Sequence, residues 1–131
     1  MFVDASAIVA ILTAESGADV LAGRLEAASQ PVTSAVAVFE ATAGVARKKA
    51  CSITVARDFV FRFLAAAGVD IVPIREREAV LALEAFDRFG KGRHPAGLNM
   101  GDCFAYACAH AFSVPLLFKG DDFARTDLGS G

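Results

Sequence analysis

Short apolar segments alternate along this chain with longer stretches of helical periodicity. Residues 1–4, 31–34, 69–73 and 114–118 have the character of buried strands, and helical patterns lie between them. Strands separated by helices of ten or more residues favour βαβ units, in which the strands are parallel and the crossovers right-handed. The sequence therefore predicts an α/β fold, with a central parallel sheet of four or five strands flanked by helices.

The helical patterns also predict which side chains face the core. Residues 7–15 and 18–28 are expected to form a helical pair that Ser6 can cap. From residue 35 the expected core positions are Val36, Phe39, Ala43 and Ala46. In residues 52–68 they are Ala56, Phe59, Val60, Phe63, Leu64 and Ala67. Residues 75–89 predict an exposed amphipathic helix with apolar positions Val80, Leu83 and Phe86, and residues 101–112 a last helix after a loop.

The size and hydropathy of the chain indicate one domain, 1–131, with an apolar surplus. The 131 residues are enough for a single core, and 55% of them are hydrophobic, with a mean hydropathy of +0.48. Such a surplus suits a sheet covered on both faces and hints at an oligomer. The longest apolar run, Ala5 to Ala14, contains Ser6 and Thr13 and is too short to span a bilayer. With no basic residue before that run, we expect a cytoplasmic protein.

Charge and cysteine usage exclude further classes. A net charge of −2 argues against coating nucleic acid by bulk electrostatics, although Arg47, Lys48 and Lys49 form a local basic cluster. The three cysteines lack the spacing of a zinc site, and we expect them to be buried free thiols.

Five carboxylates stand out because the residues around them in the sequence are mostly apolar. Asp4 follows the first strand, Glu40 lies within an apolar helix, Asp102 opens a helix rich in Ala and Cys, and Asp121 and Asp122 follow the last strand. In a parallel α/β sheet, ligands bind outside the carboxyl ends of the strands, so these acids can converge on one cleft. Clustered carboxylates repel one another unless a cation neutralises them, and oxygen-only ligands favour Mg²⁺ or Mn²⁺.

Each acid also has an ordinary structural role open to it. Asp4 can cap the helix that follows, and Glu40 can point to solvent. Asp102 can interact with the dipole of its helix, and Asp121 and Asp122 can form a turn after a glycine.

Together these residues resemble the PIN-domain nucleases, and specifically the VapC toxins of toxin-antitoxin operons. The resemblance spans nearly the whole chain. It rests on residues 1–7 (MFVDASA), on Thr33-Ser34 with Phe39-Glu40, on residues 99–107 (NMGDCFAYA), and on residues 116–123 (LLFKGDDF) with Thr126-Asp127.

The resemblance implies a Mg²⁺-dependent endoribonuclease in which Asp4, Glu40 and Asp102 bind the metal. The fourth acid is Asp121 or Asp122, with Asp121 preferred. A metal-activated water would attack the phosphodiester and leave a 3′-hydroxyl and a 5′-phosphate, with tRNA as the expected target. A cognate VapB-type antitoxin, a homodimer and a higher toxin-antitoxin assembly are the implied partners.

Several polar residues have two open interpretations. Ser6 matches a polar helper position of the family but can equally be a helix cap. Asn99 can bond a metal-bound water or the phosphate, or cap the helix of Asp102. Arg47, Lys48 and Lys49 can bind an RNA backbone or complement a helix C-terminus.

Two other functional classes stay open. Strand-end aspartates with Mg²⁺ also occur in phosphatases and receiver domains, although such a phosphatase has a second Asp where this chain has Ser6. The other alternative is an inactive or purely protein-binding module, and the complete acid set argues against it because unpaired buried carboxylates destabilise a fold.

Overall fold

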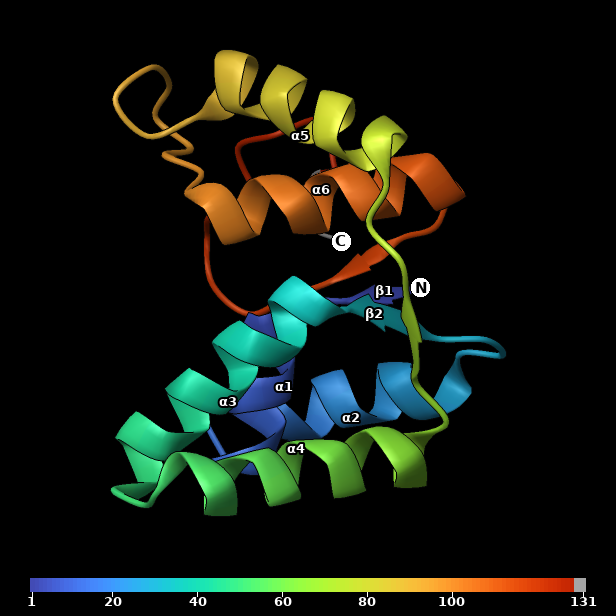
Figure 1. The fold of residues 1–131 in the computed structure, drawn as a ribbon, viewed down its shortest axis with the longest axis vertical. Coiled ribbons are helices and arrows are strands. Elements are labelled where there is room, and N and C mark those ends of the chain that lie inside the picture. Colours follow the sequence, from blue (N-terminus) through green and yellow to red (C-terminus); the bar gives the residue numbers. More distant parts are fainter. Residues whose placement is uncertain (129–131) are drawn as a thin grey trace.

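A parallel sheet crosses the middle of the molecule in a computed structural model that describes residues 1–128 (Figure 1). Its four strands are β1 (Phe2–Val3), β2 (Val32–Ser34), β3 (Asp70–Val72) and β4 (Leu116–Leu117), in the order β3-β2-β1-β4. Every pairing is parallel, and the register places Phe2 between Val32 and Leu116. The α/β prediction is confirmed, with the lower of the two expected strand numbers.

Six helices cover the two faces of this sheet in the described part of the chain. On one side lie α1 (Ala5–Leu12), α2 (Ala18–Ala27), α3 (Ala35–Lys49) and α4 (Ile53–Ala67), and on the other α5 (Glu76–Phe89) and α6 (Met100–Phe112) (Figure 1). Among residues 1–128, no helix combines the length and the apolar character that crossing a membrane requires. Because β1, β2 and β4 are parallel, their carboxyl ends share one edge, where α1 and α3 also begin.

Small residues let the helices approach the sheet and one another closely. The buried side of α3 includes Ala37, Ala41 and Val45, and this helix packs against α1. At Gly44 a β-carbon would come within 2.9 Å of the Val9 side chain, so glycine is needed for the two helices to meet at this distance. The close contact fixes the position of α3 relative to β1.

The predicted core stripe is wrong on α5 and holds only in part on α3. On α3, Ala46 is buried as expected, but the large Phe39 is 76% exposed, because the buried side is the small-residue face that meets α1. On α5 the buried positions include Ala82, Ala85 and Phe89, whereas Val80, Leu83 and Phe86 are exposed. On α4 the prediction holds in part, since Ala56, Val60 and Leu64 are buried and Phe59 is exposed. The misplaced side chains leave apolar surface open.

The cysteines partly follow expectation. All three are free, and Cys103 and Cys108 are buried in α6, but Cys51 is only half-buried after the end of α3.

Candidate active site

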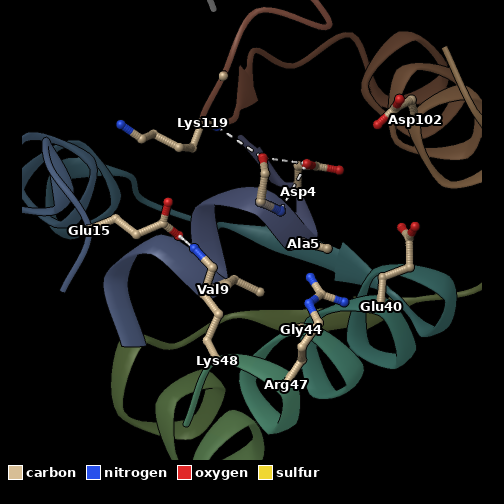
Figure 2. Close-up of a pocket in the computed structure, with 12 residues that line it drawn as sticks. Asp4, Ala5, Val9, Glu15, Glu40, Gly44, Arg47, Lys48, Asp102 and Lys119 are labelled. Carbon is tan, nitrogen blue, oxygen red and sulfur yellow. Dashed lines mark hydrogen bonds and ion pairs between the residues drawn. The ribbon is translucent and has the colours of Figure 1, made fainter. Parts of the chain in front are cut away.

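A pocket of about 450 Å³ opens at the carboxyl edge of the sheet (Figure 2). Asp4, Glu40 and Asp102 lie on one side of it, Lys48 and Lys119 lie with Glu15 on the other, and Arg47 lies between the two sides. Its lining consists of Asp4, Ala5, Ser6, Val9, Glu15, Glu40, Gly44, Arg47, Lys48, Asp102, Lys119 and Gly120. Three of the predicted acids, Asp4, Glu40 and Asp102, thus come from distant parts of the sequence to one cavity.

Asp4 is held rigidly where β1 ends. Its Oδ2 accepts hydrogen bonds from the Ser6 backbone N–H, at 3.0 Å, and from the Ser6 hydroxyl, at 2.6 Å. Asp4 is therefore the cap of α1, and the expectation that Ser6 is the cap is wrong because Ser6 already lies inside the helix. Capping uses one carboxylate oxygen, and Figure 2 shows the other directed toward the space between Glu40 and Asp102.

Glu40 projects from α3 against the first turn of α6. A β-carbon built at Gly101 would collide with both carboxylate oxygens of Glu40. A side chain at position 101 would therefore force the Glu40 carboxylate to move from its present place beside the first turn of α6. Gly101 lies in the first turn of α6, and nothing in the sequence pattern indicated this packing role for it.

Asp102 takes part in a reciprocal cap at the start of α6. The Asp102 backbone N–H donates to the Asn99 side chain at 2.9 Å, and the Asn99 backbone N–H donates to Asp102 Oδ2 at 3.1 Å. The capping interpretation of Asn99 thus describes its contacts, and Asn99 lies outside the pocket lining. As with Asp4, the cap fixes one oxygen of the carboxylate.

The carboxylates of the pocket perturb one another. Burial raises the pKa of Asp4, and burial followed by repulsion from Asp4 raises the pKa of Glu40. The pKa of Asp102 rises to about 7, first through burial and then through repulsion from Asp122, Asp4 and Glu40. Glu40 and Asp102, which face Asp4 in Figure 2, are therefore destabilised when they carry negative charge. A cation bound among these carboxylates would relieve that destabilisation.

Asp121 and Asp122 are the two candidates for the fourth acid, and they differ in their effect on the pocket carboxylates. Both are exposed and lie outside the pocket lining, in the segment after β4. Asp122 nevertheless raises the pKa of both Asp4 and Asp102 by charge repulsion, whereas Asp121 is not among the causes that act on either carboxyl. The position of the two residues in the turn after β4 does not by itself decide which side chain faces the cleft.

The carboxylate oxygens of the pocket suit a hard divalent cation, although they do not surround a position for the ion completely. Within residues 1–128, no three His, Cys, Asp or Glu side chains converge tightly enough to hold an ion as they stand. The acids that face the pocket offer only oxygen donors, with repulsion among them still unrelieved. Mg²⁺ suits this arrangement because it binds through one or two carboxylates and keeps several waters.

The basic cluster divides into residues with different surroundings. Arg47 and Lys48 line the pocket, while Lys49 lies over the Phe59 ring, at 5.1 Å, away from it. Lys119 also lines the pocket, and its Nζ donates to the Ser16 carbonyl oxygen at 2.6 Å. Lys119 and Glu15 could not be recognised as pocket residues from the sequence, since only the fold brings their segments together.

Two side chains anchor the segment that carries Asp121 and Asp122. Phe123 is 2% exposed, and its ring packs edge-on against Phe118 at 5.1 Å. Tyr106 of α6 donates a hydrogen bond from its hydroxyl to Asp127 Oδ1 at 2.6 Å. The bond between Tyr106 and Asp127 holds the chain after β4 beside α6, and the contact between Phe118 and Phe123 folds that segment onto itself.

Comparison with known proteins relates the chain to one family. A family model described as the PIN domain matches residues 1–128. A VapC ribonuclease of Rhizobium meliloti is 41% identical, covering 98% of this chain and 99% of that protein. The ribonuclease VapC42 of Mycobacterium tuberculosis is 40% identical over 98% of this chain and 96% of its own. A ribonuclease VapC of Mycolicibacterium smegmatis is 42% identical over 99% and 98% of the two chains.

Proposed function

The chain belongs to the PIN-domain family, and from that premise we propose that it is a metal-dependent endoribonuclease that acts as the toxin of a VapBC-type toxin-antitoxin pair. The observation that carries the proposal is the pocket itself, where Asp4, Glu40 and Asp102 gather beside cationic residues. The relatives named as VapC ribonucleases support the ribonuclease assignment.

Asp4 and Asp102 would hold Mg²⁺ directly and Glu40 would reach it through a bound water, with Asp122 as the fourth acid and Mn²⁺ as an alternative ion. When bound, the ion supplies a Lewis acid that polarises the phosphodiester and lowers the pKa of a water molecule. Asp4 offers the most fixed oxygen, because Ser6 locks the other oxygen of the same carboxylate. Ser6 is thus a positioning residue.

Glu40 is the residue we propose to orient the attacking water and accept its proton. Its carboxylate is half-buried, ends a flexible side chain and carries a raised pKa, as suits a general base. Attack by water rather than by the RNA 2′-hydroxyl would leave a 3′-hydroxyl and a 5′-phosphate. Structured RNA, tRNA in particular, is the proposed substrate.

Arg47 is proposed to contact the RNA backbone near the cut. Figure 2 shows its guanidinium reaching into the space between the acidic and lysine sides of the pocket. A planar guanidinium can grip a phosphate through two parallel hydrogen bonds, which a lysine cannot do.

The exposed apolar side chains support partners at two surfaces. Phe39, Ile53 and Phe61 line a hollow between α3 and α4, and a second hollow between α5 and α6 is lined by Leu83, Phe86, Met100 and Phe104. Contiguous apolar surface of this kind marks protein interfaces. We propose that a VapB-type antitoxin and a second copy of the chain cover these surfaces. A higher toxin-antitoxin assembly then forms when both surfaces are occupied at once.

Incubation of the purified protein with total RNA and Mg²⁺, followed by sequencing of the cut ends, tests this function. The expected result is a small set of cuts with 5′-phosphate ends that disappear with EDTA and with Asp4→Asn. Absence of any cut from antitoxin-free protein in Mg²⁺ or Mn²⁺ would favour the inactive, protein-binding alternative. Activity that survives EDTA would contradict the metal-dependent mechanism.

A further inference from the structure

The pocket contains a second group of charges that the proposed chemistry does not use. Opposite the acids lie Lys48 of α3 and Lys119 of the segment after β4, with Glu15 between them (Figure 2). These residues come from three separate parts of the chain. Their meeting in the cavity that holds Asp4 and Asp102 is a product of the fold and places positive charge in the same pocket as the acids.

Each lysine already binds an oxygen of the turn between α1 and α2. Lys48 Nζ lies 2.8 Å from Glu15 Oε2, and Lys119 Nζ donates to the Ser16 carbonyl oxygen at 2.6 Å. Both lysines on this side of the pocket therefore already bind oxygen atoms, and one of these belongs to the anionic carboxylate of Glu15.

A phosphate can replace the Glu15 carboxylate as the partner of Lys48. The two side chains keep 27% and 40% of their surface exposed, and an ion pair at that exposure contributes little to stability. A lysine ammonium has three donors, so Lys119 can keep Ser16 and still donate to a second oxygen. A phosphate that arrives tethered to a strand already bound at the acids needs to displace only the Glu15 carboxylate.

We propose that this lysine side is a second phosphate subsite, where Lys48 and Lys119 bind the RNA phosphate next to the one that is cut. Glu15 occupies the subsite in the free protein and yields Lys48 when the strand binds. The proposal rests on the proposed ribonuclease function and deepens it, because it assigns the contact that holds the strand in register across the pocket.

The subsite acts on binding and not on the reacting atoms, which gives a specific kinetic signature. Lys48→Gln and Lys119→Gln should each raise KM roughly fivefold with kcat little changed, as expected for loss of a phosphate contact. Each should also reduce the slope of log KM against log salt concentration by about 0.7 to 1. Glu15→Gln should act in the opposite direction and lower KM severalfold, because it releases Lys48.

The experiment uses a fluorescent RNA oligonucleotide that contains a cut site mapped in total RNA, with kcat and KM measured at several salt concentrations. Lys91→Gln and Glu26→Gln are matched controls that remove the same charges from exposed residues outside the pocket. Melting temperatures report whether each variant is folded, and Lys48→Arg should restore most of the lost affinity.

The outcomes separate this subsite from the function on which it rests. If the wild type cleaves normally and the Glu15 and lysine variants have the same KM values as the controls, the subsite alone is overturned. A fall in kcat without a rise in KM also overturns it, because that would place the lysines in the chemistry. If the wild-type protein cuts no RNA, the proposed function fails and the subsite fails with it.

Discussion

Replacing Asp102 by Asn should stabilise the metal-free protein at alkaline pH and leave it unchanged in acid. The folded protein keeps the Asp102 proton up to a pKa of about 7, against the ordinary value of 3.8. Between these values the unfolded chain binds fewer protons than the folded one, so wild-type stability falls as pH rises through that window and the loss is complete above it. Asn cannot ionise, and its carbonyl oxygen can still accept the Asn99 N–H bond.

The magnitude follows from the shift of about three pKa units, which corresponds to roughly 4 kcal/mol at 1.36 kcal/mol per unit. Because Asp102 is partly exposed, solvent screening reduces this to about 2 kcal/mol. For a chain of this size that is a rise in melting temperature of roughly 8 °C.

Thermal unfolding in EDTA at pH 4 and pH 8 measures the effect, with the exposed Asp70→Asn of β3 as control. Added Mg²⁺ should then raise the melting temperature of the wild type at pH 8 more than that of Asp102→Asn, because the ion binds the folded carboxylates. Equal differences between variant and wild type at both pH values would refute the reasoning, as would a variant less stable at pH 8.

Further substitutions test the other parts of the site. Gly101→Ala should abolish most RNA cleavage by displacing the Glu40 carboxylate. The free energy of unfolding in urea should change by no more than about 1 kcal/mol, because alanine favours the helix. Full activity of this variant would mean that Glu40 is free to move. Asp122→Asn should reduce kcat at least tenfold more than Asp121→Asn, and the reverse order would restore Asp121 as the fourth acid. Tyr106→Phe should lower the free energy of unfolding by about 1 to 2 kcal/mol through loss of its bond to a carboxylate, and an unchanged urea midpoint would show that this bond does not anchor the C-terminal segment.

The fold was predictable because it depends on features that recur along the chain. The alternation of apolar strands with helices was enough to predict a parallel sheet, and β1, β2, β3 and β4 all lie within the expected segments. The core faces of α3 and α5 were not predictable from large apolar residues. Close helix packing selected small ones such as Ala37 and Ala82, and left Phe39 and Leu83 outside.

The site divides in the same way. Asp4, Glu40 and Asp102 could be singled out because a carboxylate in apolar sequence is unusual, and the structure places all three around one pocket. The companions Lys119 and Glu15 gave no such signal, because charged residues in loops are ordinary and their meeting depends on the tertiary fold. The choice between neighbouring aspartates after β4 depended on turn geometry, which the sequence does not specify.

The proposed function requires that the carboxylates of Asp4, Glu40 and Asp102 form a divalent-metal centre. Crystals of the purified protein grown with Mn²⁺ would test it directly through the anomalous difference map. The account predicts a peak in contact with Asp4 and Asp102 and close to Glu40, lost in Asp4→Asn. A map without a peak at saturating Mn²⁺, or with the ion only at surface carboxylates elsewhere, would contradict it.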